Sequence, residues 1–142
     1  MTKEANTLNG GCLCGNVRYQ IHGDPLFVSQ CFCRDCQLAT GTGHTTIVGV
    51  HCDNLTVEGT PTVFSSQGET GGAVHRHFCG TCGSRLYTSG DLPGPVRMIQ
   101  AGSLNDPNAV SPTAAIYLKD RIHWDMVADD IDQHMDLGPA PV

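Results

Sequence analysis

The sequence is poor in aromatic residues, in positive charge and in long apolar runs, and each shortage excludes a class of protein. Only 6% of the 142 residues are aromatic, and 8 Lys and Arg face 14 Asp and Glu, for a formal net charge of −6. A chain this acidic is a poor binder of phosphate backbones, so nucleic acid is not an expected partner. No apolar run approaches the roughly 20 residues of a membrane-spanning helix, so we expect no membrane segment.

The amino-terminal residues also lack the apolar segment of a secretory signal. We therefore expect a cytoplasmic protein, in which thiols stay reduced. A chain of this length is expected to form one domain over residues 1–142, with flexible ends at 1–9 and 138–142. The residues alone do not indicate an oligomeric state.

Helical periodicity is scarce, whereas apolar and polar residues often alternate with period two. The alternation predicts a mainly β chain of antiparallel sheets. Strands are expected at 17–21, 45–50, 55–57, 63–64, 74–78, 85–87, 96–101 and 114–118. Short helices are predicted at 34–39 and 125–134. The 17 glycines supply turns between these segments, and the modest core suggests that bound metal helps to hold the fold.

Cysteine, by contrast, is plentiful, and seven of the 8 cysteines form three tight clusters. Such spacings let neighbouring thiolates converge on one metal ion, and a reducing compartment favours metal over disulfides or a redox dithiol. Glycine follows two of the clusters, where positive φ would let amide N–H groups point at sulfur. The clusters are Cys12-x-Cys14, Cys31-x-Cys33-x-x-Cys36 and Cys79-x-x-Cys82.

The clusters divide naturally into one group of four cysteines and one group of three. Cys31, Cys33 and Cys36 can reach one ion without long-range closure, which leaves the two outer pairs for a second ion. Structural zinc sites are closed by four protein ligands, whereas catalytic sites use three and keep one position open. We therefore predict one structural and one reactive Zn²⁺ site. Two alternatives stay open: a second structural site completed by His44 or Cys52, and iron in place of zinc.

The motifs resemble those of the glutathione-dependent formaldehyde-activating enzyme family, also called the centromere protein V/Gfa-type domain. The resemblance extends from about residue 8 to residue 125, and position 32 is Phe where the family motif most often has His. The matching segments are Gly11-Cys-x-Cys-Gly15, Cys31-Phe-Cys-Arg-Asp-Cys-Gln37 with Thr40-Gly41, Phe78-Cys-Gly-Thr-Cys-Gly83, Ala101-Gly-Ser-Leu-Asn-Asp106-Pro and His123-Trp124.

The resemblance implies an Mss4-like, β-tent fold and assigns the two cysteine groups. Cys12, Cys14, Cys79 and Cys82 would hold a structural zinc, and the middle cluster would hold the zinc linked to activity. The implied reaction joins glutathione to formaldehyde and gives S-hydroxymethylglutathione, a carbon–sulfur lyase activity. The alternative is a non-catalytic, zinc-stapled binding module or a glutathione carrier.

Several other polar residues lie near the cysteine motifs in the sequence. Arg34, next to Cys33, is the best placed cation for a glutathione carboxylate. Arg76 and Arg85 are interpreted as solvated strand charges. Cys52 lies outside every cluster and is expected to be a buried or free thiol. His75 and His77 alternate along an expected strand and are interpreted as part of its face.

Overall fold

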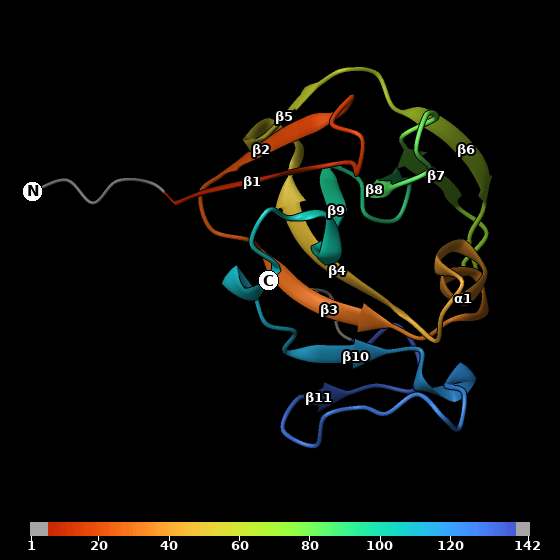
Figure 1. Ribbon diagram of the computed structural model, residues 1–142. Helices are drawn as coiled ribbons and strands as arrows, with labels where there is room; N and C mark the ends of the chain where they lie inside the picture. The colour runs from red at the N-terminus through yellow and green to blue at the C-terminus, as the bar shows by residue number, and fades with distance from the viewer. Residues whose placement is uncertain (1–5, 139–142) are drawn as a thin grey trace, which may run out of the picture.

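Two β-sheets of unequal size form the framework of the protein, seen in a computed structural model that describes residues 6–138. The smaller sheet has the order β1-β2-β5 and is antiparallel throughout (Figure 1). Its strands are β1 (Thr7–Gly11), β2 (Arg18–His22) and β5 (Leu55–Glu58). The mainly β, Mss4-like prediction is thereby confirmed.

The larger sheet has eight strands in the order β11-β10-β3-β4-β9-β8-β7-β6. From β3 to β6 in this order, neighbouring strands pair in antiparallel fashion. Strand β10 pairs in parallel with both β3 and β11, so the sheet is mixed and the purely antiparallel prediction is wrong at this edge. The strands are β3 (Phe27–Cys31), β4 (Thr45–His51), β6 (Thr62–Gln67), β7 (Ala73–Phe78), β8 (Arg85–Gly90), β9 (Val96–Gln100), β10 (Ala114–Ile116) and β11 (Asp132–Gln133).

One α-helix, α1 (Arg34–Thr40), follows β3 directly, as the sequence predicted. The residue before it, Cys33, caps the first turn with its side chain, and the residue after it, Gly41, ends the helix in the left-handed conformation with φ of 76°. Four short 3-10 turns complete the described elements: η1 (Cys52–Asn54), η2 (Ala101–Ser103), η3 (Pro107–Ala109) and η4 (Leu118–Asp120). No helix in residues 6–138 has the length and apolarity to cross a membrane.

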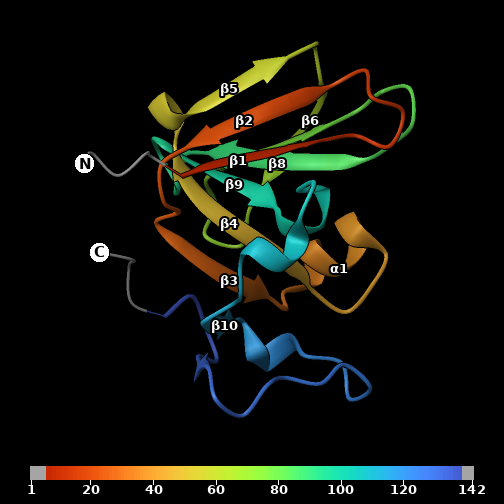
Figure 2. The ribbon, with the colours of Figure 1, turned by 60° about the vertical axis from the view of Figure 1, so that its left-hand side comes forward.

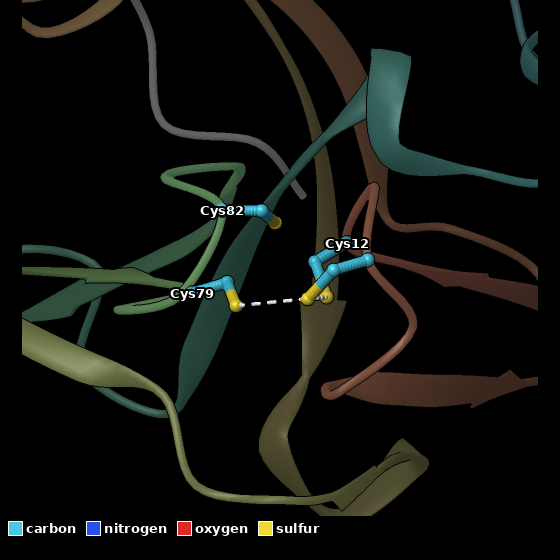
Figure 3. Close-up of side chains that lie close together, drawn as sticks. Cys12, Cys79 and Cys82 are labelled. Atoms are coloured by element: carbon cyan, nitrogen blue, oxygen red, sulfur yellow. Dashed lines mark hydrogen bonds between the residues drawn. The ribbon is translucent and has the colours of Figure 1, made fainter.

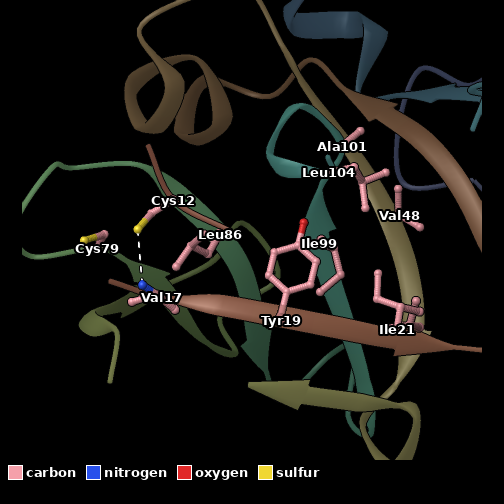
Figure 4. Packing of buried hydrophobic residues seen from close by; sticks show 11 residues of the cluster. Cys12, Val17, Tyr19, Ile21, Val48, Cys79, Leu86, Ile99, Ala101 and Leu104 are labelled. Atoms are coloured by element: carbon pink, nitrogen blue, oxygen red, sulfur yellow. Dashed lines mark hydrogen bonds between the residues drawn. The ribbon is translucent and has the colours of Figure 1, made fainter. Parts of the chain in front are cut away.

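The main core lies between the two sheets, which are stacked in Figure 2. Tyr19 and Ile21 of β2 are buried while their neighbours in the strand are exposed, as the period-two pattern predicted. They pack against Val48 and Ile99 of the large sheet (Figure 4). Cys12 and Cys79 belong to the same buried cluster, so the four-cysteine group lies at the end of this core.

A second, smaller core joins the carboxy-terminal segment to the loop after β3. Phe32 is fully buried there with Ala115 and Leu118, and Val127 and Ile131 pack against them. The helix predicted at 125–134 is wrong. Backbone donors of this segment bond to β10 instead, with His134 N–H donating to the Ala115 carbonyl oxygen at 2.9 Å. Strand pairing therefore overrides the i, i+4 spacing of Val127 and Ile131.

The strand predictions were largely confirmed, and the errors lie near the ends and edges of the sheets. Every predicted strand overlaps an observed one, but β1, β3 and β11 were missed. The flexible end predicted for residues 1–9 is wrong at residues 7–9, because Thr7 begins β1 and pairs with His22. Residues 1–5 and 139–142 of the predicted ends lie outside the described residues.

Candidate metal centres

The four sulfurs of Cys12, Cys14, Cys79 and Cys82 converge, all within 4.8 Å of one another (Figure 3). The Cys14 sulfur lies 3.6 Å from that of Cys12 and 3.7 Å from that of Cys79. A tetrahedral zinc site with Zn–S bonds of about 2.3 Å needs sulfurs about 3.8 Å apart. The sulfur spacing therefore fits a closed four-thiolate zinc site.

Two matching turns bring the four sulfurs together, one between β1 and β2 and one between β7 and β8. In the first, Gly15 N–H donates to the Cys12 carbonyl oxygen at 3.2 Å; in the second, Gly83 N–H donates to that of Cys79 at 2.8 Å. Both glycines have positive φ, 85° and 79°. Their left-handed conformation is the one that the sequence predicted.

Amide and hydroxyl donors surround these sulfurs and connect the two turns. Val17 N–H donates to the Cys12 sulfur at 3.3 Å. Ser84 Oγ accepts from Leu13 N–H at 2.9 Å and lies 3.3 Å from the Cys82 sulfur. The Ser84 hydroxyl donates to that sulfur, and its hydrogen bond is the main reason that the pKa of Cys82 is lowered to about 5. The Ser84 contact thus favours the thiolate form of Cys82, which is the form that a metal requires.

The second group consists of Cys31, Cys33 and Cys36, whose sulfurs also lie within 4.8 Å of one another. Cys31 ends β3, and Cys36 lies in the first turn of α1. The Cys36 N–H donates to the Cys33 sulfur at 3.4 Å. Hydrogen bonds from the thiols of Cys31 and Cys36 lower the pKa of Cys33 to about 2, and the contact with Cys33 is the main reason that the pKa of Cys31 is raised.

Gln37 fixes the position of the loop that carries this second group. Its side chain is buried, and Nε2 donates to the carbonyl oxygens of Phe32 and Asp120, each at 3.0 Å. The loop is thereby attached to the carboxy-terminal segment. Phe32 itself is fully buried, which explains why an apolar residue stands at this position between two cysteines.

Neither candidate for a fourth ligand joins the group of three. His44 stacks on Phe32, and its Nδ1 lies 2.6 Å from Asp125 Oδ2. Cys52 lies in a separate group with its chain neighbours His51 and Asp53. Within residues 6–138 the group around Cys31 therefore contains three metal-ligating side chains, which is the ligand count of a site with an open position.

The arginines and histidines near the cysteine motifs of the sequence lie in distinct places in the fold. Arg34 is exposed on α1, and its Nη1 donates to Gln37 Oε1 at 3.0 Å. His75 and His77 bond to serines of the neighbouring strands, at 2.7 Å and 3.0 Å, which agrees with a strand face. Arg76 and Arg85 are half-buried rather than solvated, and the charge of Cys36 acts on Arg85.

Tyr117 was missed by the sequence analysis. Its backbone φ is 57°, in the left-handed region. Among the described residues, every other residue with positive φ is a glycine. Such a conformation costs about 1–3 kcal/mol and is concentrated at functional sites. Burial raises the pKa of Tyr117, as do the charges of Glu69, Cys31 and Cys33. Residues 114–118 read as one strand in the sequence, so nothing in the pattern marked this break.

A cavity of about 640 Å³ lies away from both cysteine groups. It is bordered by β1, β3 and the loop before β10, with residues such as Leu8, Phe27 and Val110, and no cysteine lines it.

Comparison with known proteins agrees with this arrangement. The model of the glutathione-dependent formaldehyde-activating enzyme family matches residues 7–120, which span both cysteine groups. A crystal structure of a Rhodobacter sphaeroides protein has a similar fold, with a TM-score of 0.55 and 20% identity over 73% of this chain and 91% of the other. No curated protein matches the chain. The family match covers most of the sequence, and the chain belongs to the glutathione-dependent formaldehyde-activating enzyme family.

Proposed function

We propose that the protein is a zinc-dependent carbon–sulfur lyase that joins glutathione to formaldehyde and forms S-hydroxymethylglutathione. The observation that carries the proposal is the group of three converging sulfurs without a fourth ligand among the described residues. Membership of the family supports both substrates. We also propose a cytoplasmic location, because all eight thiols are free and a reducing compartment keeps them so.

The two cysteine groups would have different tasks. Cys12, Cys14, Cys79 and Cys82 would hold a structural Zn²⁺, since their sulfur spacing fits a closed tetrahedron. The middle cluster would hold the second ion, which supplies a position where a thiol is deprotonated at neutral pH. Three thiolates leave the site with a net negative charge, so it suits a thiol ligand better than a carbonyl oxygen.

The reaction is an addition in which the atoms of both substrates are retained. The sulfur of glutathione forms a bond to the carbonyl carbon, the electron pair of the C=O π bond passes to oxygen, and that oxygen takes up the proton that the thiol released. The described residues prepare the site for this step. Cys36 N–H donates to the Cys33 sulfur, and Gln37 holds the loop in place, so the thiolates are oriented before substrate binds.

A Cys31→Ser variant tests the proposal, with Cys52→Ser as the matched control outside both groups. Cys31→Ser should lose one zinc ion and all turnover, while the four-cysteine group keeps the protein folded. Turnover is measured as glutathione-dependent loss of formaldehyde above the uncatalysed rate. Unchanged turnover in Cys31→Ser would exclude the proposed site. Wild-type protein that binds glutathione without turnover would be a carrier, and one that does neither would be a binding module.

A further inference from the structure

Arg76 of β7 and Arg85 of β8 lie on the same face of the large sheet. Arg76 pairs with Thr88, whereas Arg85 pairs with Phe78, which is two residues beyond Arg76 and so on its face. In a regular strand, side chains alternate between the two faces, so Arg85, three residues before Thr88, would lie on the face opposite to Arg76. An irregularity in the pairing at His77 and Phe78 changes the register by one residue and brings Arg85 back.

The two guanidinium groups lack carboxylate partners. Neither forms an ion pair with any carboxylate in the described part of the chain, although acidic residues outnumber basic ones by 14 to 8 in the sequence. Arg76 donates to Ser66 Oγ at 3.0 Å. Burial lowers the pKa of Arg85, and the nearby positive charge of Arg76 lowers it further. Two half-buried like charges side by side are unfavourable unless an anion completes them.

The two arginines lie near the group of three cysteines, because the charge of Cys36 acts on Arg85 and that of Arg76 acts on Cys36. Hydrogen bonding also attaches the loop of these cysteines to the segment after β10, where Gln37 Nε2 donates to the Asp120 carbonyl oxygen at 3.0 Å. The β6–β7 turn reaches the segment after β10, where Lys119 Nζ lies 2.7 Å from Glu69 Oε1. Phe64, opposite Arg76 on β6, is 61% exposed, so this face is accessible to a small molecule.

We propose that Arg76 and Arg85 bind the glycine carboxylate of glutathione while its sulfur enters the three-cysteine site. The inference rests on the proposed function and names how the thiol is selected. In glutathione this carboxylate is one peptide unit away from the cysteine residue. The other carboxylate stands beside an ammonium group, which two arginines would repel. Guanidinium groups bind carboxylates through paired, charge-assisted hydrogen bonds, so the pair selects acidic thiols over neutral ones.

The test compares glutathione with its analogue in which the glycine carboxylate is an amide, using calorimetry on the full, zinc-loaded chain. Wild type should bind glutathione at least roughly tenfold more tightly than the amide, as expected for a charge-assisted hydrogen bond. Arg85→Gln, and independently Arg76→Gln, should bind both compounds with similar affinity. Arg97→Gln is the control, because Arg97 adjoins Met98, which pairs with Thr88, and so lies on the opposite face. It should keep the wild-type preference.

Each other result has a definite meaning. Equal wild-type affinity for the two thiols would overturn the inference and leave the proposed function standing, whereas no binding of either thiol would overturn both. If Arg34→Gln lost the preference for glutathione over the amide while Arg85→Gln kept it, the carboxylate would bind to α1 and the inference would be overturned. Loss of the second zinc ion from Arg85→Gln would also overturn the inference, since the arginines would then serve to balance the charge of the metal site.

Discussion

Replacing Cys79 by Ser should unfold the protein, because this residue connects the two sheets through the four-cysteine group. Cys79 is 2% exposed and belongs to the main core, and its sulfur lies 3.7 Å from that of Cys14 in the other turn. Apart from the sulfurs, the turns are joined by hydrogen bonds from Leu13 to Ser84 and from Asn16 to Thr81. Each of these contributes only about 1 kcal/mol.

The magnitude follows from comparing the metal site with the stability of a domain. Structural zinc supplies an apparent ~10–16 kcal/mol in small zinc domains. The free energy of unfolding of a folded domain is about 5–15 kcal/mol, so loss of the metal site would remove all or most of the stability of the folded state. We expect Cys79→Ser to show no cooperative thermal transition by circular dichroism and to lose the structural zinc ion by elemental analysis.

The matched control for this change is Cys52→Ser, which makes the same substitution at a half-buried cysteine outside both groups. Its free energy of unfolding should stay within about 0.5 kcal/mol of wild type. A Cys79→Ser protein that unfolds cooperatively near the wild-type temperature would refute the reasoning, since the four sulfurs would then not hold a stabilising metal.

Two further predictions concern stability. Burial raises the pKa of Tyr19 from 10.0 to about 12, so folding favours the protonated phenol; its contribution is present below pH 10 and is lost as pH rises to about 12. Tyr19→Phe, which lacks the 2.6 Å contact with Ser103, should therefore be less stable than wild type at pH 8 by about 1 kcal/mol. Between pH 10 and 12 the free energy of unfolding of wild type should fall by about 2 kcal/mol relative to that of the variant, so the order of stability should reverse. A difference in urea unfolding that stays constant over this range would contradict the prediction. Asp125→Ala removes the partner of His44 Nδ1 and should lower the free energy of unfolding by about 1–3 kcal/mol, while an unchanged urea midpoint would show that the pair contributes nothing.

The parts of the fold that sequence reasoning predicted are those with a strong local signal. Tyr19 and Ile21 alternate with polar neighbours, and the strand that they form faces the core as expected. The helix after Cys33 also has a local cause, because the Cys33 side chain caps its first turn. The segment at 125–134 has no such cause, since its backbone partners lie on β10, far away in the sequence. Local patterns cannot reveal a distant hydrogen-bonding partner.

In the candidate site, too, some features have a local signal in the sequence and others depend on contacts between distant segments. The spacing of the cysteines by itself predicted the group of three, because ligands this close in sequence can reach one ion whatever the rest of the chain does. Only the tertiary structure brought the two pairs of the other group together, since Cys14 and Cys79 are 65 residues apart in the sequence. Only the tertiary structure decided that His44 and Cys52 stand apart from the group of three. It alone placed Arg85 beside Arg76, through a one-residue shift in strand register, and turned Tyr117 into a left-handed conformation. The physical reason is that register and backbone strain are set by contacts between distant segments, which the order of residues does not display.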